Sequence, residues 1–415
     1  MDAYERIKQL AIRQLDQSHN VLEDMEESAV RNYLTNMIDG EVQSTFDEGG
    51  FNGGFEHPRE VVRTLLDDLL GLGPIDDLLR DQQVSEIMVN RFDTVFVERG
   101  GKLKRSPVNL ESEQRVRQII DRIVTPLGRR IDESSPMVDA RLACGSRVNA
   151  IIPPLAVDGS SLTIRKFSKK QLTLDDLVQS DSCSAELADI LPILVTSKFN
   201  ILVSGGTGSG KTTLLNILSS FIPGEERIVT VEDAAELQVN HSNLVRLEAR
   251  PANQEGEGEV SIRKLVVNAL RMRPDRIIVG ECRASESLDM LQAMNTGHCG
   301  SMTTIHANTC RDALRRLETL VLMSGMELPI NAIRQQMTSA IHFVLQVSRT
   351  SEGKRRIESL CEVQGSESNT IQLAELFKRD PVSQKLIPTG EVSLLTQVLP
   401  ESYKARIISA TMGAD

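Results

Sequence analysis

A glycine-rich loop that ends in lysine and threonine is the strongest chemical pattern in this sequence. Residues 205–212 read GGTGSGKT and fit G-x-x-x-x-G-K-[ST], between an apolar segment that predicts a strand and one that predicts a helix. Backbone N–H groups of such a loop can surround phosphate oxygens, helped by the positive end of the helix dipole. The predicted phosphate-binding residues are Gly205, Gly206, Thr207, Gly208, Ser209, Gly210, Lys211, Thr212 and Thr213.

The end of this loop predicts which groups the site binds. Lys211 should reach the β- and γ-phosphates, and Thr212 should bind Mg²⁺ directly, so the predicted cofactors are ATP and Mg²⁺. A dinucleotide-binding loop is the alternative, but that pattern needs a glycine where Lys211 stands.

Acidic side chains end two further predicted strands. RIVTVED ends at Glu232 and Asp233, and RIIVGE ends at Glu281. The carboxyl ends of strands in a doubly wound sheet gather at the ligand site, so we expect these carboxylates near the triphosphate. One would hold Mg²⁺ through water, and another would orient or deprotonate the attacking water. Gly280 stands where most phosphate-loop enzymes have an Mg²⁺-linked aspartate, so the pattern leaves open whether Glu232 or Glu281 is the base.

Two histidines bracket a predicted strand in NTGHCGSMTTIHAN, residues 295–308. A catalytic base, a structural turn or a metal site would each explain part of this segment. The metal alternative is a zinc site from His298, Cys299, His306 and Cys310, although their spacing matches no standard Cys/His pattern.

Three arginines lie on predicted strands upstream of the loop, at Arg141, Arg147 and Arg165. They are either solvated edge residues or groups that reach across a domain or subunit boundary to stabilise charge on the γ-phosphate. The arginines of RMRPDR, residues 271–276, are interpreted as structural or interfacial.

The elements that position these residues predict an α/β fold. From residue 185 onward strands alternate with helices, which predicts a mostly parallel sheet covered on both faces, with a helical and strand region at the C-terminal end of this 185–415 domain. Residues 58–168 predict an α/β N-terminal domain, with a hairpin turn at Gly100-Gly101, and 169–184 a polar linker. Residues 1–57 predict a helical extension, joined to the next domain by a glycine-rich segment at 48–58.

Composition excludes several classes of protein. The formal net charge of −11 and the 3% aromatic content disfavour a nucleic-acid surface. The sequence has no apolar run of about 18 residues, and its first residues are polar, unlike a secretory signal. Six scattered cysteines without a CxxC pair are typical of reduced thiols. We expect a cytoplasmic protein.

Four ordered segments resemble the motifs of the type II/type IV secretion ATPase superfamily: GGTGSGKTTLLN (Walker A), VTVEDAAELQ (Asp box), NALRMRPDRIIVGECR (Walker B) and AMNTGHCGSMTTIHAN (His box). The run at 240–310 is most similar to the Tad (tight adherence, CpaF-like) pilus branch. The resemblance implies a RecA-like P-loop ATPase domain, a homohexameric ring, and ATP-driven work on an inner-membrane platform protein. It implies peripheral membrane association through that partner.

The resemblance also implies roles for single residues. Glu232 and Asp233 belong to the Asp box and Glu281 to Walker B. Both histidines would lie beside the nucleotide, where His306 would sense the γ-phosphate and His298, counted among the nucleotide-binding residues, would tie the sheet to the domain interface. Arg147 and Arg165 match positions that contact the γ-phosphate from the N-terminal domain, and Arg141 is placed with them. Pilus assembly or protein secretion is the expected function. The alternatives are the ATPase of a conjugative or effector-exporting system and, from another class, a small-molecule kinase.

Overall fold

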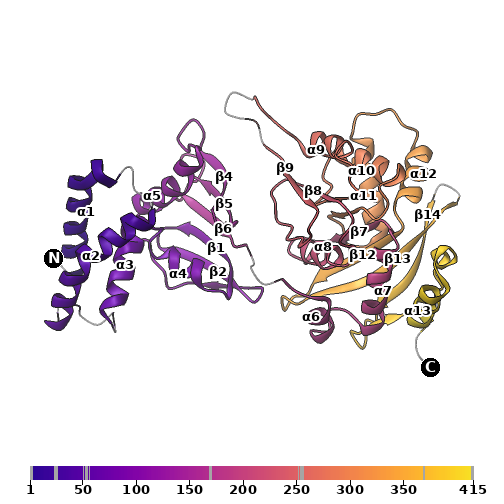
Figure 1. The fold of residues 1–415 in the computed structure, drawn as a ribbon, viewed down its shortest axis with the longest axis horizontal. Helices are drawn as coiled ribbons and strands as arrows, with labels where there is room; N and C mark the ends of the chain where they lie inside the picture. Colours follow the sequence, from indigo (N-terminus) through magenta and orange to yellow (C-terminus); the bar gives the residue numbers. More distant parts are fainter. Residues whose placement is uncertain are drawn as a thin grey trace. The chain divides into compact units, whose positions relative to one another are not determined.

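The protein divides into two compact units, Met1–Ser168 and Lys169–Asp415 (Figure 1). The structure is a computed structural model, and it describes residues 3–22, 27–49, 51, 55, 57–167, 171–250, 252, 257–367 and 370–412. The predicted glycine-rich joint at 48–58 and the start of the predicted linker at 169–184 lie partly outside these residues. None of the helices in the described ranges is long and apolar enough to cross a membrane.

The first unit begins with three helices that share one apolar core. They are α1 (Ala3–Leu22), α2 (Glu27–Asp47) and α3 (Pro58–Leu70). Ile7, Leu34 and Leu65 are buried where the three pack together. Pro58 occupies the first turn of α3, where a missing N–H has no consequence, and Gly71 follows its end.

An antiparallel six-stranded sheet forms the rest of this unit, in the order β3-β2-β1-β6-β5-β4. Its elements are α4 (Ile75–Arg80), β1 (Val84–Arg91), β2 (Thr94–Arg99), β3 (Lys102–Arg105), α5 (Glu113–Val124), β4 (Met137–Arg141), β5 (Arg147–Ile151) and β6 (Ser161–Arg165). The hairpin predicted at Gly100-Gly101 is confirmed, because both glycines have positive φ, +56° and +77°, between β2 and β3. Ser112 caps α5, whose apolar face packs on the sheet.

The second unit contains the predicted mostly parallel sheet. Nine strands lie in the order β15-β14-β13-β12-β7-β11-β10-β8-β9. The parallel ones are β7 (Ile201–Gly205), β8 (Ile228–Glu232), β9 (Leu244–Glu248), β10 (Arg276–Val279), β11 (Met302–Ile305) and β12 (Phe343–Arg349). An antiparallel extension consists of β13 (Arg355–Glu367), β14 (Thr370–Arg379) and β15 (Leu386–Pro388).

Helices cover both faces of this sheet, which confirms the α/β class (Figure 1). One face carries α6 (Leu174–Gln179), α7 (Ala185–Thr196), α8 (Lys211–Ser219) and α13 (Glu401–Met412). The other carries α9 (Ile262–Ala269), α10 (Glu286–Asn295), α11 (Cys310–Leu322) and α12 (Ile330–Ala340). Alternate residues of a central strand enter the two cores: Ile201 and Val203 enter one, and Leu202 enters the other.

Two parts of this unit differ from what the sequence pattern suggests. The predicted linker contains α6, because Thr173 and Asp176 form a capping box and Leu174 and Leu177 pack against the core. The polar residues that suggest a linker are the capping residues of a short helix. Strand β12 is absent from the predicted elements, yet it lies directly beside β7.

Candidate active site

The carboxyl ends of four neighbouring parallel strands meet at one edge of the sheet. In register, Ile305 of β11 lies beside Ser204 of β7, and Val279 of β10 lies beside Thr303 of β11 and Val231 of β8. The segments that follow these strands are the glycine-rich loop, His306, Glu281 and Asp233. Parallel pairing therefore gathers most of the predicted chemistry at this edge.

The glycine-rich loop has a backbone that only glycine allows at several positions. Gly208 and Gly210 have φ of +68° and +98°. A Cβ at Gly205 would lie 2.5 Å from Ser209 Oγ and 2.6 Å from the Val347 carbonyl oxygen. Gly210 is the N-cap of α8, so the N–H groups of its first turn, including those of Thr212 and Thr213, point into the loop. This cradle fits phosphate oxygens.

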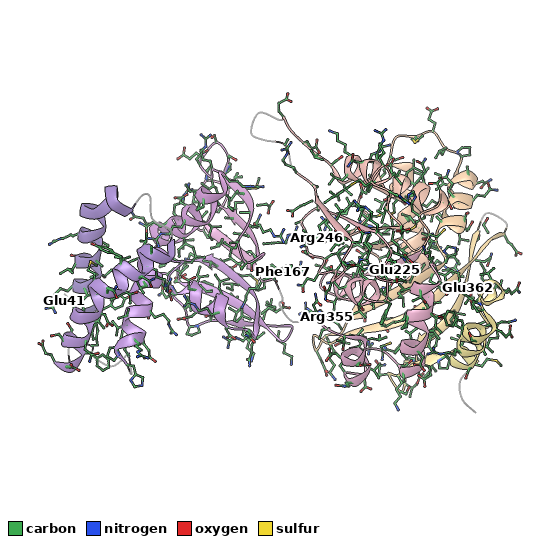
Figure 2. All side chains as sticks on the ribbon, in the orientation of Figure 1. Glu41, Phe167, Glu225, Arg246, Arg355 and Glu362 are labelled. Carbon is green, nitrogen blue, oxygen red and sulfur yellow. The ribbon has the colours of Figure 1, made fainter. Side chains whose placement is uncertain are left out.

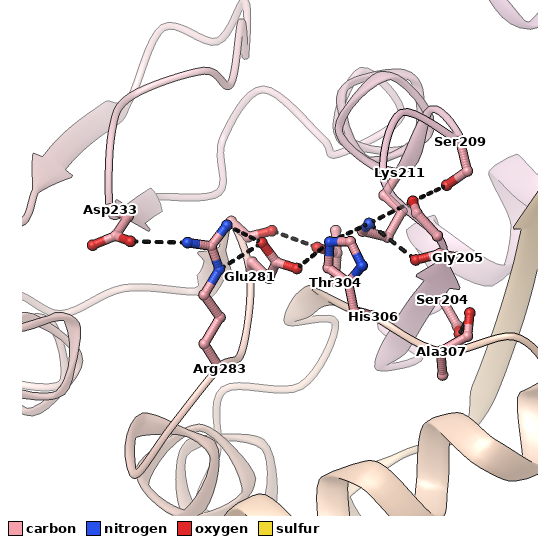
Figure 3. A network of polar contacts seen from close by, with 12 residues as sticks. Ser204, Gly205, Ser209, Lys211, Asp233, Glu281, Arg283, Thr304, His306 and Ala307 are labelled. Atoms are coloured by element: carbon pink, nitrogen blue, oxygen red, sulfur yellow. Dashed lines mark hydrogen bonds and ion pairs between the residues drawn. The ribbon is translucent and has the colours of Figure 1, made fainter. Parts of the chain in front are cut away.

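Lys211 is the first residue of α8, and its side chain is buried against the loop. Its Nζ donates to the carbonyl oxygens of Gly205 and Gly206, both at 3.0 Å, and lies 3.2 Å from His306 Nε2. The ammonium group is therefore held by loop carbonyls on one side and by the imidazole on the other (Figure 3).

His306 links this lysine to the Walker B glutamate. Its Nε2 lies 3.1 Å from Glu281 Oε1 as well as 3.2 Å from Lys211 Nζ. One ring nitrogen cannot accept from the ammonium and donate to the carboxylate at the same time. The contact with Lys211 meets hydrogen-bond geometry, whereas Glu281 Oε1 has no hydrogen-bond partner among the described residues and lies near the ring only at ion-pair distance. Burial, and then the charge of Lys211, lowers the pKa of His306 below 6.5, although Glu281 opposes this. The imidazole is therefore neutral at pH 7.

Arg283 joins two of the predicted acids and was assigned no role from sequence. Its Nη2 and Nε contact Glu281 Oε2 at 2.6 and 2.8 Å, and its Nη1 contacts Asp233 Oδ2 at 3.2 Å. Figure 3 shows the resulting row from Asp233 through Arg283, Glu281 and His306 to Lys211. A signal existed, since Arg283 stands only two residues after Glu281 at the same strand end.

Glu232 makes different contacts from Glu281. Its side chain is 2% exposed, and its Oε1 accepts the backbone N–H groups of Glu236 and Leu237, both at 2.9 Å. Burial raises the pKa of Glu232, although these hydrogen bonds oppose the shift. A Cβ at Gly280 would lie 2.9 Å from Glu232 Cγ, so glycine there leaves room for this side chain. Glu232 therefore holds the segment after β8 in place through hydrogen bonds, whereas Glu281 is the carboxylate that lies beside His306.

The structure does not bring His298 to this edge of the sheet. His298 precedes β11 and His306 follows it, so the two histidines lie at opposite ends of the strand. The prediction that His298 lies beside the nucleotide is therefore wrong within this unit. The zinc alternative fails because His298 and His306 are separated by the length of β11. Among the described residues no group of three or more His, Cys, Asp or Glu side chains could hold a metal ion.

The predicted arginines of the first unit form one row across its sheet. Arg141 pairs directly with Arg147, and Arg147 pairs directly with Arg165, so all three share one face of β4, β5 and β6. Like charges directly opposite one another destabilise a sheet, so the pairing by itself does not account for this row. Arg276 has a different role: it is fully buried and forms an ion pair with Glu226 at 2.5 Å, as the structural interpretation of RMRPDR predicts.

Comparison with known proteins identifies the family. A model described as "Type II/IV secretion system protein" matches residues 68–409. The chain belongs to this family. It is 38% identical over 325 residues to a putative conjugal transfer protein of Mycobacterium tuberculosis, covering 77% of this chain and 92% of that protein. It is 32% identical over 332 residues to the type IV secretion system protein VirB11 of Bartonella henselae, covering 70% of this chain and 92% of that protein.

Solved structures agree with this assignment at the level of fold. The ATPase DotB of Yersinia pseudotuberculosis aligns with a TM-score of 0.50 and 17% identity, over 85% of this chain and 94% of that chain. Family membership confirms the enzyme class predicted from the glycine-rich loop: the chain is an ATPase of the type II/IV secretion family.

Proposed function

We propose that the chain is an ATP-hydrolysing motor that works as a homohexamer and powers Tad-type pilus assembly or protein secretion at the inner membrane. One observation supports it most: Lys211, His306 and Glu281 form a continuous row beside a glycine loop that fits phosphate. Such a row connects the group that binds phosphate to the group that acts on water. The protein would lie on the cytoplasmic face of the membrane and act on a platform protein within it.

The residues divide the work of hydrolysis. Lys211 neutralises the β- and γ-phosphates, while the N–H groups of the loop and of the first turn of α8 orient them. Glu281 orients and deprotonates the attacking water, because it is the carboxylate that contacts His306. Mg²⁺, held by the Thr212 hydroxyl and through water by Glu281 and Glu232, would neutralise charge on the phosphates.

The arginine row of the first unit would complete the site. Arg147 and Arg165, with Arg141 beside them, would stabilise the charge that develops on the γ-phosphate.

A conjugative transfer ATPase is the second candidate. It is favoured by the relatives named for conjugal transfer, at 38% identity in Mycobacterium tuberculosis and 34% in Rhizobium radiobacter. The sequence run at 240–310 favours the pilus branch. Both candidates share the same motor and differ in the membrane partner. A small-molecule kinase has no support, since the chain belongs to the secretion family.

The test combines ATPase rate with mass in solution. The wild type should hydrolyse ATP faster as hexamers form, Lys211→Ala should lose hydrolysis with its fold retained, and Arg147→Ala should form hexamers that hydrolyse ATP poorly. Arg130→Ala is the control, since that arginine forms an ion pair with Asp132 in the same unit. Full turnover by a monomer that is indifferent to Arg147 would contradict the ring mechanism.

A further inference from the structure

A pair of arginines on the β12–β13 hairpin lies against the glycine-rich loop. Arg349 ends β12 and Arg355 begins β13, and the two are direct cross-strand partners, so their side chains share one face. The hairpin turn between them is closed by a hydrogen bond from Thr350 N to the Lys354 carbonyl oxygen at 2.8 Å. Arg355 is labelled in Figure 2 at this edge of the second unit.

Strand pairing explains how this hairpin reaches the loop. β12 runs parallel to β7, and their last register pair is Val347 with Gly205. The chain of β7 then turns into the loop, while β12 continues for two more residues to Arg349. A residue two positions further along a strand points to the same face, so Arg349 follows Val347 alongside the loop.

Arg355 contacts a glycine of the loop, and Arg349 lies next to the same glycine. Arg355 Nε donates to the Gly208 carbonyl oxygen at 3.0 Å, and a Cβ at Gly208 would lie 3.2 Å from Arg349 Nη1. The stem of Arg355 also lies under the next glycine, since a Cβ at Gly210 would lie 3.3 Å from Arg355 Cδ. The two guanidinium groups therefore meet at the loop whose backbone forms the phosphate cradle.

The charge at this place needs an explanation. The whole chain has a formal net charge of −11, yet Arg355 and Lys211 donate to carbonyl oxygens of one short loop and Arg349 lies beside it. Like charges at a direct cross-strand position repel each other, and Lys211 is a third cation at the same loop. Guanidinium groups bind phosphate with paired donors.

We propose that Arg349 and Arg355 bind the phosphate groups of the nucleotide and form a second cationic side of the phosphate site. The inference deepens the proposed function and rests on it. The Nε of Arg355 fixes the loop through Gly208, and the remaining donors of both arginines face phosphate oxygens. The positive charge of each side chain therefore increases the affinity for the nucleotide, and Arg355 also positions the loop.

The test measures binding of fluorescent ADP, with inorganic pyrophosphate as a competitor, for Arg349→Gln, Arg355→Gln and Arg355→Lys. Glutamine keeps a donor for the Gly208 carbonyl and removes the charge, whereas lysine keeps the charge. We expect each glutamine variant to weaken ADP and pyrophosphate by the same factor, about tenfold. Their affinity should also depend less on salt than that of the wild type. Arg355→Lys should lose much less.

Arg356→Gln is the matched control on the same hairpin. Its guanidinium contacts Glu358 Oε1 at 2.7 Å and Gln384 Oε1 at 2.6 Å, away from the loop, so its ADP affinity should equal that of the wild type. Unchanged affinity in both glutamine variants would overturn the inference. So would a loss for ADP without a loss for pyrophosphate, which indicates contact with the base or ribose. If Arg355→Lys and Arg355→Gln lose ADP affinity equally and both melt at a lower temperature, Arg355 only positions the loop and does not bind phosphate.

Lys211→Ala in the same assay separates this inference from the proposed function. If Lys211→Ala binds ADP and pyrophosphate like the wild type, the loop is not the phosphate site and the proposed function fails. If Lys211→Ala loses affinity while the hairpin variants keep theirs, only the role of the two arginines fails.

Discussion

Replacing Arg283 by glutamine should separate stability from catalysis. In the folded protein Arg283 contacts Glu281 Oε2 through two nitrogens and Asp233 through a third. Arg283 and Asp233 are each 54% exposed, and water screens ion pairs of that kind. Arg283→Gln should therefore lower the free energy of unfolding by no more than about 1 kcal/mol.

The effect on turnover should be much larger. Without Arg283, Glu281 keeps only the contact of its other oxygen with His306, and its carboxylate is free to rotate. A displacement of about 1 Å in a catalytic group can reduce the rate about 100-fold, so we expect kcat to fall about 10- to 100-fold. KM should change little, because none of the contacts of Arg283 described above involves the glycine-rich loop.

The assay is steady-state phosphate release together with urea unfolding. Arg263→Gln is the control, because Arg263 forms a comparable ion pair with Asp289 at 2.9 Å between α9 and α10. That variant should match Arg283→Gln in stability and the wild type in kcat. The reasoning is refuted if Arg283→Gln retains kcat within twofold of the wild type. It is also refuted if the variant loses several kcal/mol of stability, since Arg283 would then be a structural residue.

Two more predictions follow from single contacts. Burial and Lys211 lower the pKa of His306 below 6.5, so the unfolded chain binds this proton at a higher pH than the folded chain does. Stability should therefore decrease below about pH 6.5, and ATPase activity should fall only at lower pH, where the folded imidazole itself is protonated; a His306→Gln variant should lack this limb in its stability profile. In Gly300→Ala, the new Cβ would lie 2.4 Å from Arg276 Nη1, so disruption of its buried ion pair should lower the free energy of unfolding by about 3–5 kcal/mol. Gly297→Ala, with positive φ and open space, should lose only about 1–2 kcal/mol in the same urea titration, and equal losses would contradict this account.

Much of the second unit is predictable because its signals are local. Apolar strands, helix caps and the glycine-rich loop each depend on neighbouring residues, and parallel pairing brings the ends of adjacent strands together. Lys211, Glu281 and His306 could therefore be placed in one site, because each lies in or just after the segment that follows a strand. The choice between Glu232 and Glu281 could not be made, because it depends on which carboxylate turns back to its own backbone.

The arginines of the hairpin could not be predicted, because their position depends on topology. Arg349 and Arg355 lie about 140 residues beyond the loop in the sequence, and nothing in the segment between β12 and β13 resembles a phosphate motif. They reach Gly208 only because β12 is the neighbour of β7 in the sheet. Strand order is set by packing of the whole unit, which no short window of sequence contains.

The segment from 295 to 308 shows how proximity in sequence can mislead. Its two histidines are separated by β11, whose four residues extend about 13 Å at ~3.3 Å per residue. The residues before β11 hold the start of this strand in place. Ser301 Oγ donates to the His298 carbonyl oxygen at 2.7 Å and accepts a hydrogen bond from the Ile277 N–H at 3.0 Å. The second half presents His306 to Lys211 at the other end. One continuous motif thus performs two tasks at opposite edges of the sheet, because a fully buried strand runs between them.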